Sequence, residues 1–251
     1  MAHSRIVSCR SSFAVVLASV AALFVGGCAT ASSAGMPTNK IKPAFEVKVD
    51  AMPSAPGTFV SAVLNQDGSL SRVLLAPGDT LAASSDKDAQ IALAYDGTLQ
   101  IFTATLDKVT DRATLSFALS RAAGGQGGTA TVQLPAPLAL TAPTPNQQVS
   151  YAGGAGKAQL TWSNPIGDGK VHVFPFPCGS AAVSTRVHEG ADSGSFAIAT
   201  KDLVIGAPPA SGQCVTIRIQ RDVPGTVDPA FAPGSKLTAT RYDYVNVSVV
   251  P

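Results

Sequence analysis

The 251-residue chain carries 18 Lys and Arg against 16 Asp and Glu, and only 14% of its residues are charged. A hydrophobic content of 45% is enough for a substantial core, which excludes an intrinsically disordered protein. Only two residues, Glu46 and Glu189, are glutamates, which excludes a coiled coil or another protein built on long helices. The length predicts one or two domains.

The first residues have the features of an export signal. Arg5 and Arg10 precede an apolar run over residues 13–25, which is shorter than the roughly 20 residues of a membrane-spanning helix. The run is followed by two glycines and Cys28. Here the sequence resembles the signal of bacterial lipoproteins, in which small residues precede a cysteine. The resemblance implies removal of residues 1–27 and attachment of lipid to Cys28.

The resemblance further implies a cell-envelope protein that is held at a membrane through its N-terminal lipid. Ala29 stands where the family has the aspartate that retains lipoproteins at the inner membrane, which favours the outer membrane and leaves its face open. An ordinary secreted protein, cleaved near residues 29–31, is the alternative. After removal of residues 1–27 the chain has 16 basic and 16 acidic residues and no basic cluster, which disfavours binding of nucleic acid.

Two cysteines remain once Cys9 is removed and Cys28 is lipidated. Cys178 and Cys214 are predicted to form a disulfide, because exported proteins fold in an oxidising compartment. For a closed loop of about 37 residues, the chain-entropy description gives a stabilisation of the folded state of roughly 4 kcal/mol.

The remaining sequence predicts short strands separated by turns, preceded by a tether. Residues 28–43 are small and polar and are predicted to be a lipidated tether. Residues 44–135 and 136–251 are predicted to be two domains, divided near a proline-rich stretch at 135–145. Apolar residues alternate with polar ones in short runs spaced by about 8–12 residues, as in a β-sandwich. The predicted strands are 45–50, 58–64, 70–75, 90–95, 99–106, 113–119, 129–134, 148–151, 158–163, 170–174, 181–188, 196–200, 213–220 and 236–250.

The second half resembles immunoglobulin-like and fibronectin-III-like sandwich domains of bacterial lipoproteins of unassigned function. The segments that carry this resemblance are 138–143, 160–162, 192–196 and 228–234. The predicted fold class is therefore all-β, with two tandem immunoglobulin-like β-sandwich domains after a signal peptide and a short tether. Val215, Ile217 and Ile219 are predicted to face the core. This places Cys214 on the outer side of the strand with Thr216 and Arg218, and it predicts a peripheral disulfide.

Motifs of catalysis and cofactor binding are lacking in the sequence. His188 is followed by Glu189 without a second histidine at metalloprotease spacing, and Lys157 lacks the following Ser or Thr of a phosphate-binding loop. The prediction is a non-enzymatic protein without cofactor or metal. A hydrolase with an unrecognised site remains open, because sequence does not place Asp192, Asp202 and Asp222 relative to one another.

One group of aromatic residues indicates a binding surface. Val245, Val247 and Val249 are predicted to point inward, which leaves Tyr242 and Tyr244 on the opposite face of the last strand. Exposed aromatic rings stack on sugars or anchor protein partners. Cross-strand packing of the two tyrosines, or a bulge that turns them inward, is the alternative.

Two classes of function follow from these features. The first is a binding or adhesion lipoprotein that presents β-sandwich domains to a glycan or to an envelope protein. The second is an envelope-structural or assembly accessory lipoprotein. Exposed aromatic residues on one face favour the first, and an exposed apolar patch that matches a partner favours the second.

Overall fold

The computed structural model confirms the all-β class. It describes residues 30–49, 57–86, 89–106, 112–122, 125–167, 169–180, 187–204, 206–207, 209 and 211–251. The helical segments in these ranges are single turns, namely η1 (Thr38–Lys40), η2 (Ala152–Gly154) and α1 (Thr200–Leu203). None of the described helices is long and apolar enough to cross a membrane.

The strands form three sheets. The largest has eleven strands: β1 (Thr30–Ser32), β2 (Ile41–Val49), β3 (Thr58–Gln66), β4 (Arg72–Leu74), β7 (Ala94–Asp96), β8 (Ile101–Leu106), β12 (Gln148–Ser150), β14 (Lys170–Pro177), β15 (His188–Ala191), β17 (Gln213–Pro224) and β19 (Lys236–Val250). A five-stranded sheet contains β5 (Thr80–Ser85), β6 (Ile91–Ala92), β9 (Thr114–Ser120), β10 (Gly128–Gln133) and β18 (Thr226–Val227). The third sheet contains β11 (Leu140–Ala142), β13 (Lys157–Trp162) and β16 (Ser195–Ala199).

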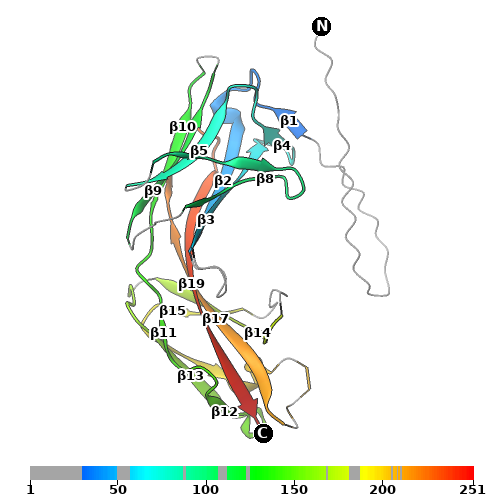
Figure 1. Cartoon of the computed structure of the whole chain (residues 1–251), viewed down its shortest axis with the longest axis vertical. Coiled ribbons are helices and arrows are strands. Elements are labelled where there is room, and N and C mark those ends of the chain that lie inside the picture. The colour runs from blue at the N-terminus through cyan, green and yellow to red at the C-terminus, as the bar shows by residue number, and fades with distance from the viewer. Residues whose placement is uncertain are drawn as a thin grey trace, which may run out of the picture.

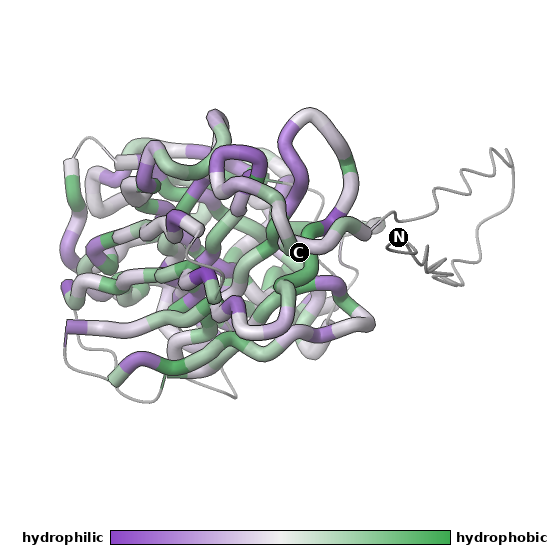
Figure 2. Tube along the Cα trace, turned by 90° about the horizontal axis from the view of Figure 1, so that it is seen from above, coloured by the Kyte–Doolittle hydropathy of each residue, from purple (hydrophilic) through white to green (hydrophobic). Residues whose placement is uncertain are grey.

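The large sheet runs through two sandwiches (Figure 1). In the first lobe, β2, β3 and β8 face the five-stranded sheet across one hydrophobic core. In the second lobe, β14, β17 and the end of β19 face the three-stranded sheet across another. Seen from above, the chain trace carries both hydrophobic and hydrophilic residues throughout (Figure 2). Buried residues alternate with less buried ones along strands such as β2 and β9, as expected for sheets with one buried face.

The last strand belongs to both lobes. Leu237 and Ala239 at the start of β19 are buried in the first core, whereas Val245, Val247 and Val249 are buried in the second. The start of β19 pairs with β2 in parallel, and nearly its whole length pairs antiparallel with β17. The inward direction of the three valines is as predicted. The first core thus contains side chains from the C-terminal segment. The domain boundary between residues 135 and 136 stays a prediction.

The predicted tether is wrong for residues 30–43. Strand β1 pairs with β4, η1 follows, and Ile41 begins β2. Ser33 is fully buried, and its Oγ donates to Asp79 Oδ2 over 2.7 Å. Small polar residues fold here because their backbone and hydroxyl groups bond to neighbouring loops, a long-range contact that composition does not reveal. Residues 28 and 29 lie outside the described ranges.

Most predicted strands are present with shifted ends. Strands β1, β5, β11 and β18 were not predicted, and the predicted strand at 90–95 is divided between two sheets as β6 and β7. The prediction for 181–188 falls mainly on residues 181–186, which lie outside the described ranges.

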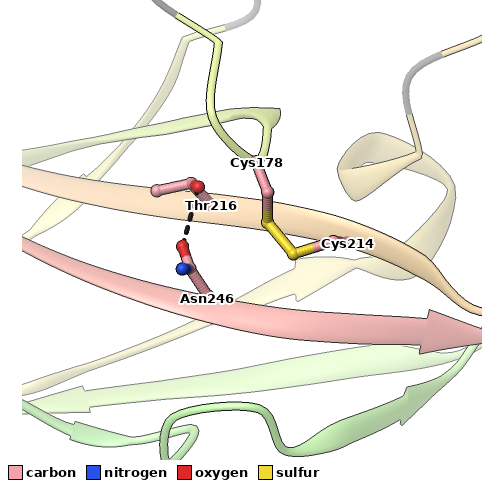
Figure 3. The surroundings of a disulfide bond; sticks show 4 residues. All are labelled: Cys178, Cys214, Thr216 and Asn246. Carbon is pink, nitrogen blue, oxygen red and sulfur yellow. Dashed lines mark hydrogen bonds between the residues drawn. A yellow bond between two sulfur atoms is a disulfide. The ribbon is translucent and has the colours of Figure 1, made fainter.

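The disulfide between Cys178 and Cys214 is present and peripheral (Figure 3). Cys178 follows the end of β14, and exposed Cys214 lies on β17 opposite the buried side of Val215. Beside it, Thr216 Oγ1 donates to Asn246 Oδ1 over 2.7 Å, which joins β17 to β19 on the same face. The bridge thus connects the end of β14 to the neighbouring strand outside the core.

Candidate functional site

The outer face of the second lobe brings the predicted aromatic residues together. Strand β17 lies between β14 and β19, with Arg218 paired in register with both Phe174 and Tyr244. Two residues further along β17, Gln220 pairs with both His172 and Tyr242. Alternate residues of a strand share a face, so these side chains all point away from the core.

Arg218 is the centre of this face. Its Cζ lies 4.2 Å from the centroid of the Phe174 ring and 5.2 Å from that of Tyr242, distances at which a guanidinium is attracted to an aromatic ring. The rings of Tyr242 and Tyr244 stack at an interplanar angle of 23°. Phe174, Arg218, Tyr242 and Tyr244 are called the Arg218 cluster below.

The two tyrosines differ in exposure. Tyr242 is 9% exposed, so the prediction that it stands open on this face is wrong, although the face itself is as predicted. Arg218 of β17 packs against its ring, which is cross-strand packing as in the alternative, and Tyr244 of its own strand, β19, stacks on it. Burial raises the pKa of Tyr242 to about 12 despite the opposing charge of Arg218. Tyr244 is half-buried, and burial also raises the pKa of its hydroxyl.

A group of polar residues borders the Arg218 cluster. His172 Nε2 lies 3.6 Å from Asp222 Oδ2, and its Nδ1 lies 3.9 Å from Glu189 Oε2. Thr240 Oγ1 donates to Asp222 Oδ1 over 2.7 Å. The hydrogen bond from Lys170, supported by its charge, lowers the pKa of the Glu189 carboxyl. The described residues contain no group of three His, Cys, Asp or Glu side chains placed to hold a metal ion.

The structure shows where Asp192, Asp202 and Asp222 lie, the three acids for which a hydrolase site remained open. Asp192 is fully buried and bonded to Trp162 and Arg221, Asp222 lies on the outer face of β17, and Asp202 lies in α1. Asp192 and Asp222 are therefore on opposite faces of the large sheet, because neighbouring residues Arg221 and Asp222 point in opposite directions. The structure does not assemble these acids into one site.

The first lobe has a hollow of about 660 Å³ beside η1. Gly35–Asn39, Arg121 and Asp228 are among the residues that line it. Arg121 is already engaged: its Nε lies 3.0 Å from Asp79 Oδ2, and its Nη2 donates to the carbonyl of Ser33 over 2.6 Å. Arg121 therefore holds the N-terminal segment around Ser33 against the loop of Asp79.

The sequence indicated the two tyrosines but not the contact of Tyr242 with Arg218. Alternation already placed Arg218 on the outer side of β17, yet its contacts depend on the register of three strands that are distant in sequence. The predicted lipid attachment at Cys28 lies outside the described residues.

No protein-family profile matches the chain, and no curated protein is significantly similar to it. Among solved structures, a two-domain fibronectin type-III segment of chicken tenascin is similar at 12% identity and a TM-score of 0.24, with 84% of this chain and 99% of that chain covered. A three-immunoglobulin-domain fragment of titin is similar at 11% identity and a TM-score of 0.23, with 83% and 65% covered.

Proposed function

We propose that this protein is a non-enzymatic, lipid-anchored protein of the bacterial cell envelope that binds a glycan or another envelope protein through the Arg218 cluster. The observation that carries the proposal is the guanidinium of Arg218 held between two aromatic rings on an outward-facing sheet surface. Tyr and Arg are among the residues that most often dominate binding energy at interfaces, and aromatic rings also stack on sugars.

The cluster is organised before any ligand arrives. Its side chains project from three strands joined by continuous ladders, so their relative positions are fixed by backbone hydrogen bonds. Packing of Tyr242 under Arg218 and Tyr244 removes rotamer freedom from the group. A ligand then loses less conformational entropy on binding, which favours affinity. The half-buried Tyr244 and Phe174 supply the contact surface, and Tyr242 supports it.

Site-specific photocrosslinking tests this function. A photoreactive phenylalanine analogue replaces Tyr244 in the full-length protein, and intact cells are irradiated before the membrane fraction is analysed. The control carries the analogue at Lys157, an exposed residue of β13 in the other sheet. The proposal predicts a discrete adduct from position 244 and none from position 157. If protease treatment degrades the crosslinked partner, the partner is a protein. If the partner stays intact on the peptide that carries position 244, it is a glycan. Absence of an adduct at both positions would contradict the proposed surface.

The envelope-structural alternative is favoured by a different observation. Ile91, Tyr95 and Leu99 are 36%, 39% and 62% exposed on one segment that crosses between the two sheets of the first lobe. An exposed apolar segment of this kind is typical of an assembly contact. An Ile91→Ser/Leu99→Ser variant distinguishes the two functions. Loss of co-purifying envelope protein from this variant, with the crosslink at position 244 absent, would support the structural alternative.

A further inference from the structure

The exposed tip of the first lobe lies next to the point where the chain enters the fold. Leu70 is 98% exposed, on the turn between β3 and β4. Strand β1 pairs in parallel with β4, with Thr30 opposite Arg72. In a parallel pair both chains run the same way, so the N-terminal end of β1 lies at the end of the sheet from which Leu70 projects.

The distance from the predicted lipid to this tip is short. Two peptide units separate Cys28 from Thr30, and they span at most about 7 Å. The headgroup layer on each side of a bilayer is about 5–8 Å thick. If Cys28 carries lipid, as in the proposed function on which this inference rests, the start of β1 is held at the headgroup layer.

The turn itself presents Leu70 in a fixed manner. The amide of Gln66 donates to the carbonyl of Ser71 over 2.9 Å, and the amide of Ser69 donates to the carbonyl of Gln66 over 3.1 Å. The hydroxyl of Ser69 accepts a bond from the amide of Ser71 over 3.0 Å. These hydrogen bonds satisfy polar groups within the turn and fix its conformation. The exposed Leu70 side chain can therefore contact lipid with little loss of backbone entropy.

Basic residues flank the tip. The exposed Lys40 ends η1, and its carbonyl accepts a hydrogen bond from the amide of Asp67 in the turn over 2.8 Å. Arg72 follows the turn and donates to Asn65 Oδ1 over 2.6 Å, which orients its side chain beside β3. Two cations against one acid, Asp67, match the negative charge of anionic headgroups.

We propose that the turn at Leu70, flanked by Lys40 and Arg72, is a membrane-docking tip that inserts into an anionic bilayer surface beside the lipid on Cys28. The tip fixes the orientation of the first lobe on the membrane. The attached lipid supplies retention, and Leu70 supplies a second contact that restrains tilting of the folded protein.

The test uses the mature chain, residues 28–251, with the Cys178–Cys214 disulfide intact and the Cys28 thiol coupled to a maleimide lipid in phosphatidylethanolamine and phosphatidylglycerol vesicles. A Leu70→Trp variant is compared with Ile166→Trp, which places the same probe at an exposed apolar position of the second lobe. Both variants retain the buried Trp162 as a common background. The proposal predicts a blue-shifted emission and at least twofold stronger quenching by shallow brominated lipid for Leu70→Trp. Equal emission and quenching in both variants would overturn it.

The contribution of charge is measured in the same vesicles. Lys40→Glu in the Leu70→Trp background is expected to lower the quenching with phosphatidylglycerol present, and to leave it unchanged in vesicles of phosphatidylcholine alone. An equal response in both vesicle types would overturn the charge contribution. Mass spectrometry of the native protein separates the two proposals. A native Cys28 without lipid contradicts the anchor and the docking, whereas a lipidated protein without quenching at position 70 contradicts the docking alone.

Discussion

Arg221 and Asp192 form a fully buried ion pair, in which Arg221 Nε donates to Asp192 Oδ2 over 2.5 Å and both side chains are 0% exposed. The remaining groups are also satisfied. Trp162 Nε1 donates to Asp192 Oδ1 over 2.7 Å, and Arg221 Nη1 donates to the carbonyl of Ala136 over 3.0 Å. Ala136 lies on the segment that passes from Leu134 in the first core to Leu138 in the second. The pair therefore ties this crossing segment to β17.

Removal of one partner tests the importance of that pair. Arg221→Met leaves the Asp192 carboxylate buried without its cation, and the free energy of unfolding is expected to fall by about 3–5 kcal/mol. Chemical denaturation followed by Trp162 fluorescence measures the loss. An Asp192→Leu/Arg221→Met double variant is expected to lose less than the sum of the two single variants, because neither then leaves an unpaired charge. Strict additivity would contradict the pairing.

Alternation of apolar residues was sufficient to predict much of the second core. Val215, Ile217 and Ile219 are inward, as expected, and Cys214 is outward. The same pattern could not predict that β17 continues beyond Gln220 and buries Arg221, because burial of an arginine depends on Asp192 from a distant loop. Pairing of β19 with both β2 and β17 is likewise a tertiary property, since strand register between distant segments is not encoded in local composition.

The candidate site was predictable in part for the same reason. The face of Tyr242 and Tyr244 follows from the period of the strand, but the burial of Tyr242 follows from its contact with Arg218 across the sheet. The folding of residues 30–43 was not predictable because Ser33 and Thr38, which are small and polar, are buried through bonds to Asp79 and to the carbonyl of Gln126.

The Asp79 carboxylate is expected to make stability fall in acid. Burial alone would raise its pKa, but hydrogen bonds from Ser33 and from the amide of Ala122, with the charge of Arg121, outweigh burial and lower the pKa below 3.8. A group whose pKa is lowered in the folded state stabilises above the unfolded value, and this contribution is lost as pH falls through the folded pKa. Denaturation at several pH values below about pH 5 is expected to show a shallower acid decline for Asp79→Asn than for the wild type. Parallel declines would contradict this role of Asp79.

Tyr242 is expected to ionise only in strongly alkaline solution, because burial raises the pKa of its hydroxyl to about 12. Its folded pKa of about 12 exceeds the ordinary value of 10.0, so the neutral hydroxyl is stabilised by folding. The contribution to stability is complete below the unfolded pKa and is lost as pH rises through the folded pKa. Alkaline titration followed by tyrosinate absorbance is expected to lose its late step near pH 12 in Tyr242→Phe. A late step that persists in Tyr242→Phe would show that the assignment is wrong.

The disulfide is expected to stabilise the second lobe mainly through the unfolded chain. Cys178 and Cys214 are 36 residues apart in sequence, and a cross-link over such a loop gives about 4 kcal/mol in the chain-entropy description. A Cys178→Ser/Cys214→Ser variant is expected to unfold at lower denaturant concentration and to retain the strands of both lobes by circular dichroism. If the variant unfolds at the wild-type midpoint, the bridge does not stabilise the fold.

The most direct measurement of the proposed function compares wild-type cells with Cys28→Ser cells by fractionation, lipid labelling and protease shaving. The wild-type protein is expected to incorporate labelled fatty acid and to stay with the membrane, and Cys28→Ser is expected to lose both properties. Cleavage of the wild type on intact cells places the Arg218 cluster at the cell surface, and protection until the outer membrane is permeabilised places it in the periplasm. Unchanged labelling and retention in Cys28→Ser would contradict a lipid-anchored envelope protein.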